Sequence, residues 1–219
     1  LMSHELIKRT LSSIILISLT LFFIIKGSYL FNFFIFILFL ITLYEWQMMS
    51  KKKIYHIPGY FFLSVSFFSL FFLINNFFYG SLFLFLFILL TCVFTDIGGY
   101  VFGKLFKGPK LTKISPKKTY SGVVGGYLFS IISIFFFVKY SVIFNLGFED
   151  ILFNIKLLIL LFTTSTVSQI GDIIISYFKR VSKIKDTGKI IPGHGGLLDR
   201  IDGMIFAFPF SYLFLLILN

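Results

Sequence analysis

Apolar segments long enough to cross a lipid bilayer recur along almost the whole of this chain. A spanning helix needs about 20 consecutive, mostly apolar residues, because each residue advances the helix by about 1.5 Å. Such segments lie near residues 10–26, 28–44, 57–74, 78–95, 122–138, 151–175 and 203–218. Hydrophobic residues make up 58% of the chain, charged residues only 13%, and the mean hydropathy is +0.97. The sequence therefore predicts an all-α, polytopic membrane bundle of about seven transmembrane helices rather than a soluble globular domain.

The first apolar segment follows two basic residues, as a signal peptide would, but it lacks a small-residue cleavage site. A second apolar segment follows at once, so we expect the first to be retained as a helix. We find no internal repeat and no linker in the sequence. We therefore expect a single membrane domain over residues 1–219.

The rarer residue types argue against two kinds of site. The single cysteine, Cys92, cannot form an internal disulfide, and the three histidines His4, His56 and His194 are too scattered to indicate a zinc site. The formal net charge is +11, but Lys and Arg lie beside the apolar segments. A membrane surface or a phosphate-bearing partner therefore fits this charge better than nucleic acid does.

The basic residues also predict which side of the membrane each loop faces. With seven spans and a cytoplasmic N-terminus, all Lys and Arg except Lys26, Lys139 and Lys156 lie on the inner side. This agrees with the excess of Lys and Arg that cytoplasmic loops carry. It places the two long polar loops, expected at residues 96–121 and 176–202, on the cytoplasmic face of the inner membrane.

Polar side chains at helical spacing mark the end of the sixth expected helix. At about 100° per residue, Gln169, Asp172, Ser176 and Arg180 fall on one stripe. An interhelical hydrogen-bond seam is the structural alternative, with Lys179 and Arg180 merely reaching for the membrane surface. A carboxylate at a bilayer boundary is costly, which favours a functional role for Asp172.

A glycine-rich turn follows within the second polar loop. Gly193, Gly195 and Gly196 allow close approach of a ligand and leave backbone N–H groups exposed to bind phosphate. Asp199 and Asp202 are three residues apart and share a face of the helix expected next. Carboxylates there could hold Mg²⁺, which prefers a few carboxylates together with phosphate oxygens. The alternative is that both are acidic residues favoured by the dipole at a helix start.

The first polar loop offers a second candidate phosphate site. Residues 115–119 read Ser-Pro-Lys-Lys-Thr, in which hydroxyls stand beside lysines. A Lys-rich inner loop is also what topology alone predicts. Asp96, at the end of a span, is costly there and favours a functional role, whereas Gly99 and Gly103 indicate helix packing. We expect the two loops to close over a single cleft with Asp96 and Asp172 at its floor.

Taken together, these residues resemble the phosphatidate cytidylyltransferase family, also called CDP-diacylglycerol synthases. The family signature is met over 27 residues by Ser176, Lys179-Arg180, Lys185-Asp186, His194-Gly195-Gly196 and Asp199-Arg200-Ile201-Asp202. Three further family elements match residues 169–172, 115–119 and 96–100. One departure is Ser121, which stands where the family often has Glu or Gln.

The resemblance implies a transferase of phospholipid biosynthesis that makes CDP-diacylglycerol and pyrophosphate from CTP and phosphatidic acid with Mg²⁺. It implies Asp172 and Asp199 as metal ligands, and Asp202 and Asp96 as further metal candidates. Catalytic roles would fall on Asp172, Asp199, Lys179, Arg180, His194 and Arg200. Substrate would be bound by Ser115, Lys117, Lys118, Thr119, Ser176, Lys185, Gly195 and Gly196. A homodimer is left open.

Two other functions stay open. A relative of this family could use the same motifs on a different lipid phosphate. A non-catalytic polytopic protein, such as a small transporter, would instead place its polar residues near the bilayer midplane. Here they cluster at the inner ends of the expected spans, which favours the enzyme. Glu45 and Trp46, at the inner end of the second span, fit an interface anchor.

Overall fold

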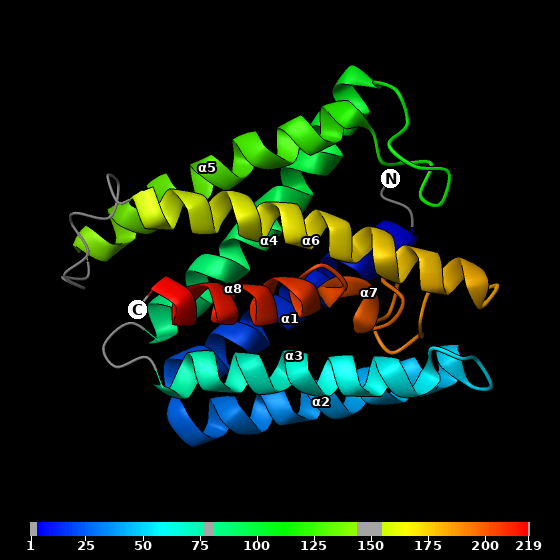
Figure 1. The fold of residues 1–219 in the computed structure, drawn as a ribbon, viewed down its shortest axis with the longest axis horizontal. Coiled ribbons are helices and arrows are strands. Elements are labelled where there is room, and N and C mark those ends of the chain that lie inside the picture. The colour runs from blue at the N-terminus through cyan, green and yellow to red at the C-terminus, as the bar shows by residue number, and fades with distance from the viewer. Residues whose placement is uncertain (1–3, 77–80, 144–154, 219) are drawn as a thin grey trace.

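The computed structural model describes residues 4–76, 81–143 and 155–218, and these form a bundle of helices (Figure 1). The helices are α1 (His4–Lys26), α2 (Ser28–Ser50), α3 (His56–Asn76), α4 (Ser81–Phe106), α5 (Tyr120–Ile143), α6 (Ile155–Val181), α7 (Leu198–Ile201) and α8 (Met204–Leu218). Within the described residues, the only β-type pairing consists of two isolated bridges, Lys110 with Thr119 and Ile191 with Gly195. The expected all-α membrane architecture is confirmed.

Each of the seven expected spans corresponds to one long helix. Among the described residues, four helical segments are long and apolar enough to cross a membrane: Tyr29–Ser50, His56–Asn75, Leu84–Phe106 and Ile155–Val181. Three shorter apolar helices, Leu11–Lys26, Tyr120–Phe135 and Met204–Ile217, account for the remaining expected spans. Residues 78–80 and 151–154, at the expected starts of two spans, lie outside the described residues.

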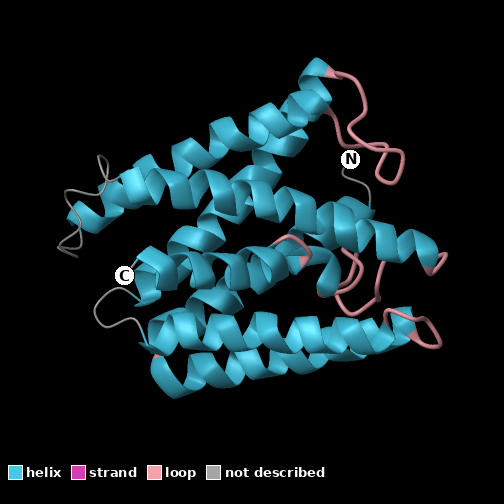
Figure 2. Cartoon of the chain, viewed as in Figure 1, coloured by secondary structure: helices cyan, strands magenta, loops and turns pink. Residues whose placement is uncertain are grey.

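Several helices continue past the apolar segments and into the residues expected as polar loops, 96–121 and 176–202. α4 continues to Phe106 and α6 to Val181, which leaves shorter loops at residues 107–119 and 182–197. The apolar segments end near residues 95 and 175, but a helix keeps its hydrogen bonds as it leaves the apolar layer. Asp96 and Asp172 therefore sit on regular helices. Figure 2 shows these loops and the α2–α3 turn at one end of the bundle.

The interior of the bundle combines an apolar core with buried polar side chains, and much of its outer surface is apolar. Large apolar side chains such as Ile25, Tyr29 and Phe61 are more than 70% exposed, as contact with lipid chains requires. Buried hydroxyls join the helices instead: the Thr95 and Ser165 hydroxyls lie 2.9 Å apart, and Ser66 Oγ donates to the Ile205 carbonyl oxygen at 2.6 Å. Since lipid tails are as apolar as leucine, such bonds and close packing must hold the helices together.

Glycines let α4 and α5 approach closely. A Cβ on Gly98 would collide with the carbonyl oxygen of Gly125, and one on Gly122 would come within 2.8 Å of the Gly99 carbonyl oxygen. A Cβ on Gly103 would lie 3.8 Å from the Gly122 Cα on the same surface. Gly99 and Gly103 thus lie at the α4–α5 contact as predicted, but the closest approach is made by Gly98, Gly122 and Gly125.

Gly98→Ala should lower the thermal unfolding temperature in detergent, because overpacking a tight contact costs about 1–3 kcal/mol. Gly99→Ala is the matched control, since its Cβ would meet its nearest neighbour, the Gly122 carbonyl oxygen, at 3.6 Å. That substitution should be neutral or slightly stabilising because Ala favours helix over Gly. Equal melting temperatures for both variants would contradict the packing described here.

Candidate active site

The loop between α4 and α5 meets α6 through one lysine. Lys118 Nζ forms an ion pair with Asp172 Oδ2 at 2.5 Å and donates to the Gln169 carbonyl oxygen at 3.4 Å. About a quarter of each partner's side chain is exposed, so this pair faces an opening rather than the protein interior. The α4–α5 loop and α6 are therefore in direct contact.

A cavity of about 290 Å³ lies at this junction. It is lined from three sides: α4 contributes Asp96 and Tyr100, α6 contributes Gln169 and Asp172, and the α4–α5 loop contributes its hydroxyl and lysine side chains. Those are the four residues expected to bind phosphate, namely Ser115, Lys117, Lys118 and Thr119. The structure thus brings together the first polar loop, Asp96 and Asp172, but no residue of the second polar loop lines this cavity, so the closure of both loops over a single cleft stays a prediction. Their binding function stays a prediction.

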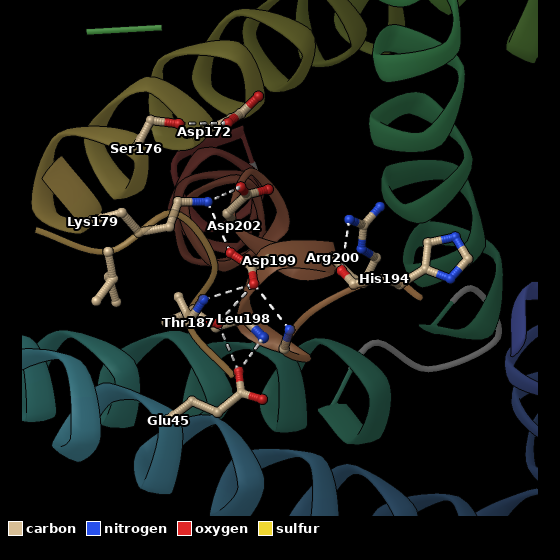
Figure 3. A network of polar contacts seen from close by, with 12 residues as sticks. Glu45, Asp172, Ser176, Lys179, Thr187, His194, Leu198, Asp199, Arg200 and Asp202 are labelled. Carbon is tan, nitrogen blue, oxygen red and sulfur yellow. Dashed lines mark hydrogen bonds and ion pairs between the residues drawn. The ribbon is translucent and has the colours of Figure 1, made fainter. Parts of the chain in front are cut away.

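The polar face of α6 differs from the expected stripe by one residue. Ser176 Oγ donates to Asp172 Oδ1 at 3.3 Å, as neighbours on one face should. The next member is Lys179, which is buried and pairs with Asp199 and Asp202 (Figure 3). Arg180 instead lies on the exposed side and donates to the Ile184 carbonyl oxygen at 3.1 Å. It borders a shallow open groove with Lys113, Ile114, Pro116, Tyr177 and Val181.

Asp199 is enclosed in protein hydrogen bonds. Its Oδ1 accepts from Lys179 Nζ at 2.9 Å, and its Oδ2 accepts the N–H groups of Thr187 and Gly196 at 2.8 and 2.9 Å. The Thr187 hydroxyl lies 3.1 Å from the same oxygen. Metal binding by Asp199 stays a prediction, but these contacts favour a role in holding the loop.

Asp202 lies just before α8, and its side chain is largely buried. Burial raises its pKa well above the usual range, and the negative charges of Asp172 and Asp96 raise it further. Lys179, 3.8 Å away, and Lys118 lower it. Three carboxylates therefore act on one another across the space between α4, α6 and α8, and a cation there would relieve their repulsion.

Among the described residues, no three His, Cys, Asp or Glu side chains form a group that could hold a metal ion by themselves. Mg²⁺ commonly takes only one or two carboxylates from the protein and completes its coordination with water and phosphate oxygens. Asp172 and Asp202, with Asp96 nearby, fit an ion shared with a substrate. Asp199 fits less well because its Oδ2 accepts two backbone N–H groups and only 4% of its side chain is exposed, against 28% for Asp172.

The glycine-rich turn is closed by an internal hydrogen bond and contacts α1. Gly193 and Gly195 have φ angles of +76° and +88°, which favour glycine, and the Ile191 N–H donates to the Gly195 carbonyl oxygen at 2.9 Å. The His194 ring lies 2.7 Å from the Ser12 hydroxyl on α1, away from the carboxylates (Figure 3). Arg200 donates to the His194 carbonyl oxygen, and Lys185 is exposed in the same loop.

Two residues of this network were missed as site candidates from the sequence. The hydroxyl of Thr187 lies between Asp199 and Glu45, and Glu45 reaches from α2 to the start of α7. Glu45 had been interpreted as an interface anchor, yet its side chain is 1% exposed. A lone carboxylate at the inner end of a span was the signal that could have indicated it.

Comparison with known proteins extends over most of the chain. The sequence pattern of the Cytidylyltransferase family matches residues 52–218. The phosphatidate cytidylyltransferase of Haemophilus influenzae is 39% identical over 142 residues, which are 64% of this chain and 48% of that protein. That of Rickettsia bellii is 37% identical over 172 residues, covering 77% of this chain and 72% of the relative. That of Rickettsia typhi is 35% identical over 205 residues, covering 92% and 88%. The chain thus spans about half the length of the Haemophilus protein and most of both Rickettsia proteins.

Proposed function

Because the chain belongs to the Cytidylyltransferase family, we propose that it transfers the cytidylyl group of CTP to phosphatidic acid, giving CDP-diacylglycerol and pyrophosphate. The observation that carries this proposal is the cavity in which Lys117 and Lys118 face Asp96 and Asp172 at one end of a membrane bundle. Such a site can gather phosphate groups where a lipid headgroup is within reach. The names of the relatives support phosphatidic acid over another lipid phosphate.

In this reaction an oxygen of the lipid phosphate attacks the α-phosphorus of CTP. The bond from that phosphorus to the bridging oxygen breaks, and the electron pair leaves with pyrophosphate. Two polyanions must approach each other, so the protein contributes mainly positioning and charge neutralisation. Lys117 and Lys118 would neutralise phosphate charge, while Ser115 and Thr119 would donate hydrogen bonds. Lys179, Arg180 and Arg200 add positive charge at the same end of the bundle.

Mg²⁺ would neutralise phosphate charge and orient the triphosphate. We assign its protein ligands to Asp172 and Asp202, with Asp96 close by, because Asp96 and Asp172 line the cavity and Asp202 lies within range of the charges of both. Asp199 would instead hold the loop that carries Asp202.

Asp172→Asn should therefore abolish most turnover and raise the Mg²⁺ concentration needed for half-maximal rate. Asp199→Asn should lower the maximal rate but leave that Mg²⁺ concentration within about twofold, since it acts on the loop and not on the ion. Steady-state assays across a Mg²⁺ series in detergent measure both values. The assignment fails if Asp199→Asn shifts the Mg²⁺ dependence and Asp172→Asn does not.

The function itself is tested by CTP turnover with and without phosphatidic acid, with pyrophosphate and CDP-diacylglycerol both quantified. Lys117→Gln or Lys118→Gln should slow the reaction about 10- to 150-fold, the effect of losing one charge-assisted contact of about 1.5–3 kcal/mol. Lys107→Gln, an exposed lysine outside the cavity lining, is the matched control and should stay near wild type. Turnover that ignores phosphatidic acid but requires another lipid phosphate would identify the alternative substrate.

We further propose that the chain lies in the inner membrane with its N-terminus and both polar loops in the cytoplasm. The positive-inside pattern supports this, as does the gathering of three loops at one end of the bundle (Figure 2). Single-cysteine labelling of intact cells, in a Cys92→Ser background, should leave cysteines at Ser115 and Ser182 unreacted until the inner membrane is permeabilised. Reaction from outside intact cells at either position would refute this topology.

A further inference from the structure

Glu45 is a buried carboxylate whose function neither the reaction nor the resemblance explains. It lies near the C-terminal end of α2, upstream of the region that matches the family, and its side chain is 1% exposed. Within the described residues, no Lys or Arg forms an ion pair with it. An unpaired buried carboxylate is costly unless hydrogen bonds compensate it, so its partners indicate its role.

Backbone N–H groups supply most of that compensation. Glu45 Oε1 accepts from the Leu197 N–H, and Oε2 accepts from the Leu198 N–H, both at 2.8 Å. These two groups belong to the first turn of α7, where no helical carbonyl is available to them. Hydrogen bonds to an ionised acceptor are about twice as strong as neutral ones. Glu45 thus fixes where α7 starts, although it lies 152 positions earlier in the sequence than Leu197.

The loop before α7 is shaped around the same carboxylate. A Cβ on Gly188 would lie 2.7 Å from Glu45 Oε1, and one on Gly196 would collide with Oε2. Positions 188 and 196 must therefore be glycine for the loop to reach Glu45. The sequence indicated that a ligand could approach Gly196, but in the structure the Glu45 carboxylate lies against it.

Thr187 connects this carboxylate to the candidate active site. Its hydroxyl lies 3.0 Å from Glu45 Oε2 and 3.1 Å from Asp199 Oδ2, and it can donate to only one of them at a time. Its N–H donates to Asp199 at 2.8 Å. Asp199 in turn holds Lys179, which lies 3.8 Å from Asp202 (Figure 3). A continuous series of contacts therefore runs from α2 to Lys179 and Asp202.

We propose that Glu45 is a positioning residue for the transfer reaction, which anchors α7 and the loop before it so that Lys179 and Asp202 keep their places. Glu45 touches no substrate in this scheme. The proposal rests on the proposed function for its kinetic readout, but its structural readout is independent of that function.

Glu45→Gln tests the proposal, because an amide keeps the shape of the side chain but loses the charge and one acceptor oxygen. In folded, monodisperse protein it should lower kcat about 10- to 150-fold and change the KM for CTP less than about threefold. Hydrogen exchange followed by mass spectrometry should become faster at Leu197 and Leu198. Ser66→Ala is the matched control: it removes a buried bond between α3 and α8, far from the loop in sequence, and should leave kcat and that exchange unchanged.

Thr187→Val provides a second variant in case Glu45→Gln does not fold. It removes the hydroxyl between the two carboxylates and should also lower kcat, whereas Thr187→Ser should restore it. Combined with Glu45→Gln, Thr187→Val should add much less than its own effect, since both act through one network. Unchanged exchange at Leu197 and Leu198, or a kcat loss that Ser66→Ala equals, overturns the proposal. If exchange is faster in Glu45→Gln but the wild-type chain does not turn over CTP, the proposed function is overturned and the anchoring role of Glu45 stands.

Discussion

Compensation of buried negative charge at one end of a membrane bundle is the constraint on which the rest of this structure depends. Glu45, Asp172, Asp199 and Asp202 all lie where helices leave the apolar layer, and each is costly there without partners. Lys118, Lys179 and several backbone N–H groups compensate these charges. Lys118 comes from the α4–α5 loop and binds Asp172 on α6, whereas the N–H groups at the start of α7 bind Glu45 on α2. Charge compensation therefore draws the first loop onto α6 and the second onto α2.

Close contacts between the membrane-embedded helices hold the helix ends that carry the candidate site in place. Glycine contacts bring the backbones of α4 and α5 together, and buried hydroxyl pairs join α4 to α6 and α6 to α8. Neither kind of contact depends on water being expelled, which is the force that a lipid environment cannot supply between helices. Lys118 is therefore held against Asp172 by a loop whose two ends are both fixed.

The helices could be predicted from the sequence because length and apolar content are local properties. All seven long helices lie near their expected positions, and the differences are at helix ends: α2, α4 and α6, for example, continue beyond the apolar segments to Ser50, Phe106 and Val181. Local spacing also placed Asp172 and Ser176 on one face. Contacts between distant segments leave no such pattern: nothing in the sequence links His194 to Ser12 or Glu45 to Leu197. The choice of Lys179 over Arg180 depends on where α7 packs, which helical periodicity alone does not contain.

One helix carries both centres of charge compensation. Asp172 faces the cavity with Lys118, and Lys179 faces α7 and Asp202, seven residues further along an unbroken α6. Seven residues of α-helix correspond to about 10.5 Å, so α6 sets the distance between the Asp172 and Lys179 centres. No movement of either loop alone can change that separation. A shift of α6 along its axis would carry both centres together, so the spacing between them survives any rigid-body motion of the bundle.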